Sequence, residues 1–383
     1  MGSPSGQYSR LWFARETSPG TLPAFSTTYG LRLYQEEFQV RPTKTPIRYQ
    51  ENKGGTTFDH TDFTPGPQAV TATLRFALRY SGVHAAMLAH AVGTLGTTGP
   101  SGTPPVYTHT LDGGGSGKFN SVSFVHHRPI NDAGTSFIET QLLGAKVGRM
   151  RLTQSVGQPF IICEMDIVAQ EAKQLTTFGS GYPPDSGGYS PTEAVIHTSH
   201  VLDTTGAPPN TPPRNFILTA RSASTTPAYV QLEEWTMELN NFPEQLGVIS
   251  NVQRQSNPAR GQVREVTGSF VMEQDSQTAI VEAAYGLTAA DPSDDFKLIW
   301  SFENPANVDH ELQIDVSQAY ITQAERGTSG TGPQRRRYNF AAHAQGSQAV
   351  WSTAFPLRMI FRNTTQGPYG STMGGGIAYA NHV

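Results

Sequence analysis

Residues 70–93 read VTATLRFALRYSGVHAAMLAHAVG, and residues 262–286 read QVREVTGSFVMEQDSQTAIVEAAYG. Each stretch begins with alternating apolar and polar side chains, the pattern of a strand with one buried face. Each then continues into a short helix that begins at a polar cap and ends at a glycine. The caps are Ser81 and Asp275, 194 residues apart, and the glycines are Gly93 and Gly286, 193 residues apart. This regularity predicts one strand-and-helix module that is used twice.

Each copy also has an upstream strand, separated from it by a long polar loop: Gly30–Val40 in the first and Tyr229–Asn241 in the second. Glycine and proline bound several further alternating runs, which we predict to be strands. These are Tyr107–Leu111, Val122–His126, Phe137–Leu143, Lys146–Thr153, Phe160–Gln170, Phe296–Phe302, Leu312–Val316 and Leu357–Phe361. The chain is therefore expected to be mainly β, with two tandem β-sandwich or partial-barrel domains, each with one short packing α-helix.

The 383 residues are enough for two domains of ordinary size. We expect an irregular N-terminal arm over residues 1–28, a first domain over 29–178 and a second over 193–362. A linker rich in Gly, Pro and Ser fills residues 179–192, and an extended glycine-rich arm follows over 363–383.

Composition excludes several classes of function. The formal net charge of −4 argues against a dedicated nucleic-acid binder, whose domain would be basic. Cys163 is the only cysteine, so an intrachain disulfide and a thiolate metal site are excluded, and its alternating apolar neighbours favour a buried structural thiol. We find neither a secretory signal nor a run of about 20 apolar residues, so assembly in a cytoplasm without membrane insertion is expected.

Motifs for catalysis or cofactor binding are nearly absent. Gly113–Lys118 has the glycines of a phosphate loop, but Asp112 and Phe119 stand where the motif needs Gly and Ser or Thr, so we interpret it as a turn. Asp59, His60 and Asp62 could approach a metal ion, although a solvated or contact-forming loop is the simpler interpretation. The sequence predicts no enzyme and no cofactor.

Two polar features are left. Arg335, Arg336 and Arg337 follow Gly327–Gln334 in what we expect to be a loop, either as a solvated charge run or as a contact with an acidic surface such as Asp291, Asp294 and Asp295. The repeated strand pair is expected to have one dry face and one wet, acidic face. The acidic residues assigned to the wet face are Glu37, Glu234, Glu238, Glu265 and Glu273.

The order of strand, long loop, strand and capped helix, followed by Leu142–Leu152, resembles the major tail tube proteins of long non-contractile-tailed phages (siphophages). Val263–Phe270 is similar to that family's second-half pattern, and Leu312–Tyr320 to its following strand. The resemblance covers about residues 29–173 and 227–362. It implies tube domains whose strand pairs join neighbouring subunits into a continuous barrel, with the helix outside and the long loop reaching the next ring.

From this resemblance we expect a structural virion protein that polymerises as stacked rings around the DNA channel of the tail. A tandem copy implies trimeric rings with pseudo-hexameric symmetry. The resemblance also implies contacts with a tape measure protein and with tail terminator and tip proteins, and genomic DNA only in transit. Expected inter-ring contacts are Arg41, Lys44, Arg48, Glu51, Lys53, Asp59, Asp62, Asp291, Asp294, Asp295, Arg335, Arg336 and Arg337, and the acidic wet face is expected to line the lumen.

An alternative function is a two-domain β-sandwich binding module, such as an adhesin or a carbohydrate-binding protein. Such a module needs exposed aromatic side chains beside polar ones. Tyr182, Tyr189, Tyr369 and Tyr379 are the candidates.

Overall fold

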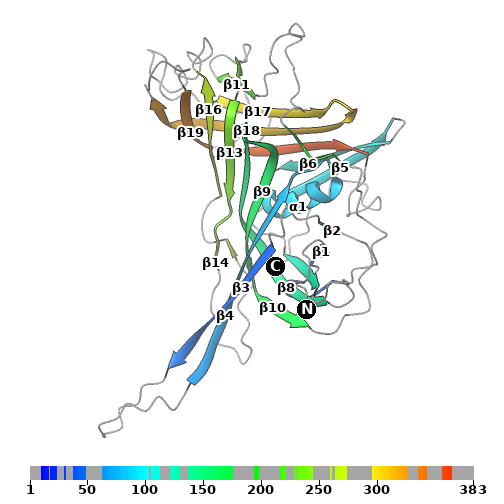
Figure 1. Ribbon diagram of the computed structural model, residues 1–383, viewed down its shortest axis with the longest axis vertical. Helices are drawn as coiled ribbons and strands as arrows, with labels where there is room; N and C mark the ends of the chain where they lie inside the picture. Colours follow the sequence, from blue (N-terminus) through cyan, green and yellow to red (C-terminus); the bar gives the residue numbers. More distant parts are fainter. Residues whose placement is uncertain are drawn as a thin grey trace.

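The fold is taken from a computed structural model of the whole chain. It describes residues 10–16, 18–23, 30–31, 38–48, 63–102, 105–112, 121–129, 137–175, 194–197, 216–220, 228–230, 232–244, 259–260, 264–273, 296–326, 335–342 and 356–364. These residues form one helix and many antiparallel strands (Figure 1). The prediction of a mainly β protein is therefore confirmed.

One open sheet of eight strands runs through the molecule in the order β3-β4-β9-β8-β13-β16-β19-β18, and every neighbouring pair is antiparallel. The bounds of its strands are β3 Phe38–Arg48, β4 Phe63–Ala77, β8 Phe137–Ser155, β9 Gln158–Ala169, β13 Leu232–Asn240, β16 Glu265–Glu273, β18 Asn307–Arg326 and β19 Arg335–Ala342. The first four strands and the last four have the same order. The pairing of β8 with β13 joins the two groups edge to edge.

The long strands β8 and β18 each leave this sheet in their first halves and enter a second layer. The first half of β8 pairs with β7 and β10, and the first half of β18 pairs with β17 and β20. Figure 1 shows β17 and β18 running across the direction of β13. The second-layer strands are β1 Arg10–Arg15, β2 Gly30–Leu31, β5 Thr94–Ser101, β6 Val106–Asp112, β7 Val122–Pro129, β10 Glu171–Leu175, β11 Phe216–Ala220, β12 Ala228–Val230, β17 Phe296–Asn304 and β20 Leu357–Asn363. A separate two-stranded ribbon joins β14 Pro243–Glu244 to β15 Ala259–Arg260.

Two of our predicted elements merge in this arrangement. We expected Gly144 to separate two strands, but β8 continues through it, with Gly144 at φ 60°. At this point the strand passes from the second layer into the eight-stranded sheet. A glycine fits here because other residues rarely adopt a positive φ.

The helix α1 spans Gly82–Val92 as predicted. The Ser81 side chain accepts a hydrogen bond from the Val83 N–H, and Gly93 ends the helix at φ 130°. Both ends therefore have the caps that the sequence indicates. Burial lowers the pKa of His84 and of His90 to about 3, so both helix histidines are neutral. The second predicted helix, 275–286, lies outside the described residues.

The hairpin β5–β6, which follows α1, ties the two halves together a second time. Strand β6 pairs with β20, so a hairpin of the first half extends the second layer of the second half. Buried apolar side chains from both halves form one cluster, with Phe76 and Trp235 among its members. The domain boundaries remain a prediction, but the halves share hydrogen bonds and core.

The N-terminal segment differs from our expectation of an irregular arm. Arg10–Arg15 form β1, which pairs with β7, and Leu11, Trp12 and Phe13 are buried. The buried Glu16 carboxylate accepts hydrogen bonds from the Gly20 and Gly144 N–H groups and the Ser123 hydroxyl. The expectation of an irregular segment is therefore wrong for residues 10–16, because the buried apolar side chains of β1 join the second layer.

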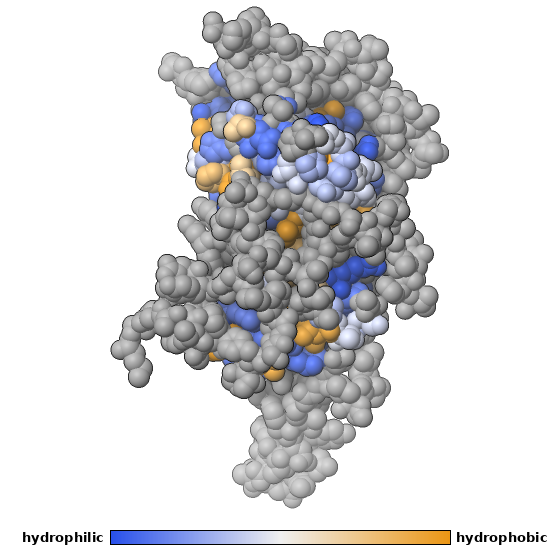
Figure 2. Space-filling model, turned by 90° about the vertical axis from the view of Figure 1, so that its right-hand side faces the viewer, coloured by the Kyte–Doolittle hydropathy of each residue, from blue (hydrophilic) through white to orange (hydrophobic). Residues whose placement is uncertain are grey.

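No helix in the described ranges is both long and apolar enough to cross a membrane. Figure 2 shows hydrophilic and hydrophobic residues in small intermixed groups on one face of the molecule. Cys163 is fully buried on β9, where burial raises the pKa of its thiol, in agreement with a structural role.

Candidate functional site on the polar face of the sheet

The eight-stranded sheet has one apolar and one polar face. On β13, Trp235, Met237 and Leu239 are buried, while Glu234 and Glu238 on the opposite face are half-buried. The same alternation occurs on β4 and β16. The apolar face packs against the second layer and α1, so the polar face is the side of the sheet that can meet water or a partner.

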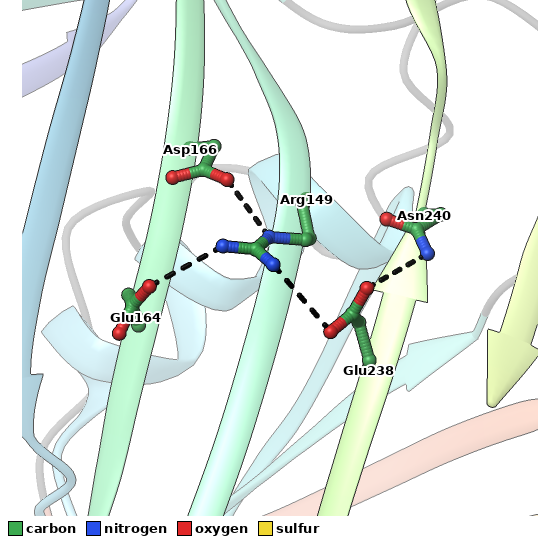
Figure 3. Close-up of polar contacts among 5 residues, drawn as sticks. All are labelled: Arg149, Glu164, Asp166, Glu238 and Asn240. Carbon is green, nitrogen blue, oxygen red and sulfur yellow. Dashed lines mark hydrogen bonds and ion pairs between the residues drawn. The ribbon is translucent and has the colours of Figure 1, made fainter. Parts of the chain in front are cut away.

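Arg149 organises the centre of this polar face, next to the β8–β13 junction (Figure 3). Its Nε lies 2.8 Å from Asp166 Oδ2, its Nη2 3.3 Å from Glu164 Oε1, and its Nη1 3.7 Å from Glu238 Oε2. Asn240 Nδ2 donates to Glu238 Oε1 at 2.9 Å. One guanidinium thus connects β9, β8 and β13, three neighbouring strands.

Arg335 and Arg337 lie on the same face, near the other end of β13. Arg335 Nε is 2.9 Å from Glu233 Oε2, and Arg337 Nη2 is 3.3 Å from Glu234 Oε2. All three arginines of this run belong to β19, so the predicted loop is wrong at this position. Alternation with Tyr338 and Phe340, both buried, is the strand signal that the charge run obscured.

The polar face carries both signs of charge, whereas we expected it to be acidic. Register and alternation place Glu164, Asp166, Glu234, Glu238, Glu265, Glu273 and Glu325 on it, together with Arg41, Arg75, Arg149, Arg151, Arg335 and Arg337. Each ion pair between such exposed groups contributes only about 0–1 kcal/mol. Their main effect is to cancel charge locally.

A shallow groove of about 390 Å³ crosses this face. Its lining includes Arg75, Arg151, Glu164 and Glu234, with threonine and serine hydroxyls between them. The described residues contain no group of three or more His, Cys, Asp or Glu side chains that could hold a metal ion. The face offers dispersed, mutually compensated charges, which suit weak contacts with a polyelectrolyte.

The predicted site residues are only partly brought together. Glu234 and Glu238 lie on β13, and Glu265 and Glu273 at the two ends of β16, all on the polar face. Arg41 lies exposed on β3, where its Nη2 donates to Gln39 Oε1, and Lys44 and Arg48 belong to the same strand. The candidates outside the described residues are Glu37, Glu51, Lys53, Asp59, Asp62, Asp291, Asp294, Asp295, Tyr182, Tyr189, Tyr369 and Tyr379.

Sequence reasoning missed a polar lock behind the β8–β13 junction, formed by Arg264 and Asn241. Arg264 donates to Asn241 Oδ1 at 2.7 Å and to the carbonyl oxygens of Val92 and Ala91 at 2.6 and 3.1 Å. Asn241 Nδ2 donates to Ala91 O and Val147 O. The residue before β16 therefore caps the C-terminus of α1, 172 residues earlier in the chain. An arginine in phase with the buried side chains of β16 was the only sequence signal.

We compared the chain with known proteins and protein families. No curated protein matches the chain. Among solved structures, the toluene transporter TodX of Pseudomonas putida is 10% identical, over 93% of this chain and 87% of the transporter, but the TM-score of 0.11 is too low to support any argument. The family described as phage tail tube protein matches residues 6–321, most of the chain. The chain, whose sheet is built from two groups of four strands, therefore belongs to the phage tail tube protein family.

Proposed function

We propose that this protein polymerises as stacked rings into the tail tube of a long, non-contractile-tailed phage, with the polar face of the eight-stranded sheet lining the channel for DNA. The observation that carries the proposal is the repeated strand order, β3-β4-β9-β8 and β13-β16-β19-β18, joined edge to edge. A tandem duplication of one tube domain accounts for this repetition. The pairing of β8 with β13 inside the chain would then have the same arrangement as the strand pairing between neighbouring chains.

The sheet is open, and an open sheet with unpaired edges tends to add further strands. Three chains, each contributing this run of eight strands, would close a barrel of 24 strands, with six four-stranded units around the axis. Strand spacing and a usual barrel tilt give roughly 50 Å from backbone to backbone. Such a ring is wide enough for a DNA duplex.

The charge on the polar face suits passage of DNA without retention. Binding to DNA gains affinity when cationic side chains neutralise phosphates and release counterions. Here Arg149, Arg335 and Arg337 already contact carboxylates of the same chain. We propose that Glu37, Glu234, Glu238, Glu265 and Glu273 face the lumen, where they hold the wall close to neutral.

Stacking of the rings is assigned to the β3–β4 hairpin. Its pairing extends from Phe38↔Leu74 to Arg48↔Phe63, whereas β9 pairs with β4 only up to Val70. The hairpin therefore projects beyond the sheet as a two-stranded arm (Figure 1). Lys44 and Arg48 on this arm and Arg41 at its base are proposed to meet the next ring. Glu51, Lys53, Asp59 and Asp62, in the sequence between the two strands of the hairpin, are proposed to do the same.

The remaining inter-ring candidates are Asp291, Asp294, Asp295, Arg335, Arg336 and Arg337. The pairing of Arg335 and Arg337 with Glu233 and Glu234 favours the channel wall over the ring surface for those two arginines. The proposed partners are further copies of the chain, a tape measure protein and tail terminator and tip proteins. The proposed location is the virion tail, after assembly in the host cytoplasm.

Negative-stain electron microscopy of the concentrated purified protein tests the proposal. Hollow rods built from three-chain rings are expected, and a monomer under every condition would refute polymerisation.

The lumen assignment has its own test, a variant with Glu265→Lys and Glu273→Lys. These carboxylates form no ion pair with another described residue, so the fold is expected to tolerate the change. Rods of the lysine variant should retain DNA in a salt-dependent way, and the matched Glu265→Gln, Glu273→Gln variant should not. Equal DNA retention by both variants would contradict the lumen assignment.

A further inference from the structure

The β8–β13 junction gives a register that can be carried to the outer edges of the sheet. Within it, Leu239 lies opposite Met150 and Met237 opposite Leu152, all buried on the apolar face. The last pair of the junction is Asn240 opposite Arg149.

The partners of each strand define which positions correspond in the two halves. Ala72 and Val266 are equivalent positions, because they are 194 residues apart, as are the two caps. Val40 pairs with Ala72 and Leu239 pairs with Val266, so Val40 corresponds to Leu239, and Phe38 to Met237. Met150 pairs with Met165 on β9, which pairs with Leu74. In the second half, Ile321 pairs with Phe340 on β19, which pairs with Gly268, the counterpart of Leu74. Ile321 therefore corresponds to Met150, and by the same steps Ala324 corresponds to Leu152.

Among the described strands, both counterpart strands have one side with no paired strand: β3 pairs only with β4, and β18 pairs only with β19 from Ile321 onward. Ile321 is 9% exposed, and Val40 and Ala324 are partly buried against the common core. The apolar layer thus reaches both edges of the sheet and ends there.

We infer that the second half of β18 of one copy pairs antiparallel with β3 of another copy, with Val40 opposite Ile321 and Phe38 opposite Ala324. This inference rests on the proposed function and specifies its contact. Gln39 then faces the bulge of β18 at Thr322 and Gln323, where two residues oppose one. Apolar side chains meet on one face of the new pair and polar side chains on the other, as at the β8–β13 junction.

A proline marks the end of this pairing. The β8–β13 pairing stops at Asn240, whose counterpart on β3 is Arg41, so Pro42 comes immediately after the last pair. Proline lacks the N–H that a ladder needs and is confined to edge strands and strand ends. With Pro46 it keeps the projecting arm out of the pairing, which therefore ends at Arg41.

The space beside β3 also fits this occupant. A groove of about 410 Å³ lies between β3 and the second-layer strands β7, β8 and β10, and its lining includes Phe38, Val40, His126 and Ala172. Strand β10 pairs with β8 as β20 pairs with β18. In the second half, the space that corresponds to this groove lies beside β20 and the β8–β13 junction, and α1 occupies it. We therefore expect a neighbouring copy to pack into the groove beside β3.

Disulfide trapping tests the register. Chains with Val40→Cys are mixed with chains carrying Ile321→Cys, assembled into rods and oxidised, so that any covalent dimer joins two copies. Directly opposite Cβ atoms lie about 5 Å apart and diagonal ones about 7 Å, and a disulfide needs about 4 Å. The matched control pairs Phe38→Cys with Ile321→Cys, which tests a register shifted by two residues. Each single variant alone controls for Cys163, which is fully buried.

Covalent dimers are expected from the Val40 and Ile321 pair, in about tenfold excess over the control. Greater yield from the shifted pair, or rods without cross-linking, would overturn the register and leave the proposed function intact. Absence of rods from the unmodified protein would instead overturn the proposed function.

A second measurement uses the unmodified chain, in case the cysteine variants do not assemble. Hydrogen exchange on rods and on monomer should show assembly-dependent protection in residues 38–41 of β3 and 321–325 of β18, in addition to any protection of the projecting arm by the next ring. If those amides exchange equally in rods and monomer, the edges are not paired and the inference is wrong.

Discussion

Replacing Arg264 with alanine should uncouple α1 from the second half of the chain. The guanidinium makes three hydrogen bonds, to Asn241 Oδ1, Val92 O and Ala91 O. Asn241 Nδ2 still reaches Ala91 O in the variant, but Val92 O loses this donor at the end of a buried helix. The cation also lies at the negative end of the α1 dipole, which adds to its stabilising effect.

The expected loss can be estimated from these contacts. A hydrogen bond to a charged group contributes about 1.5–3 kcal/mol, and an orphaned buried carbonyl costs about 1–3 kcal/mol. Because Arg264 is half-exposed and its bonds are not independent, we expect about 3 kcal/mol, or roughly a 150-fold change in the folding equilibrium. Arg264→Lys keeps the charge without the fork and should cost about half as much.

Urea unfolding of the monomer measures this change, and hydrogen exchange of the α1 amides localises it if unfolding is not two-state. A double-mutant cycle with Asn241→Ala should give a coupling energy of about 1 kcal/mol. A loss below about 1 kcal/mol for Arg264→Ala, or α1 protection that does not change, would refute the role of the lock.

Three further predictions follow from packing and titration. Gly268→Ala should destabilise the fold by about 3 kcal/mol in urea unfolding, because a Cβ there would overlap the Thr236 carbonyl oxygen and lie 2.5 Å from the Phe340 ring. Gly157→Ala is the matched control and should be neutral, because a Cβ at that position would meet open space. Thermal stability should decrease as the pH is lowered from about 6.5 to 3, because the histidines of the unfolded chain bind protons in this range whereas the buried His84 and His90 stay neutral. Each histidine should lower the free energy of unfolding by about 1.4 kcal/mol per pH unit, and His84→Asn should remove the contribution of one proton from this slope. Glu16→Ala should expose β1 to proteolysis, and resistance equal to the unmodified chain would argue against its anchoring role.

The local elements were the most predictable part of this protein. Helix α1, with its caps Ser81 and Gly93, and strands such as β13 and β16 follow from periodicity and capping chemistry, which act over a few residues. The errors occurred where the preference of a few neighbouring residues was overridden by contacts with residues far away in the sequence. Gly144 was taken for a strand end, but its hydrogen bond to Glu16 holds β8 together as it changes layers.

For the candidate site, the sequence predicted only on which face of the sheet each side chain lies. Alternation along β13 and β16 indicated which glutamates share the polar face, because side chains alternate strictly in a strand. Their partners were not predictable, since Arg149 and Arg337 come from strands far away in the sequence. The polar face, which we expected to be acidic, therefore proved to carry compensated charges once the strand order was known.

By itself, the sequence determined the β class, the first helix, the two faces of the repeated strands and the absence of an intrachain disulfide, because these depend on residue type and short-range spacing. Only the tertiary structure decided that the two groups of four strands join through β8 and β13, that Arg264 caps α1, and that β3 and β18 form the outer edges. Strand neighbours are chosen by contacts between residues many positions apart, and periodicity along a chain does not record which strand lies beside which.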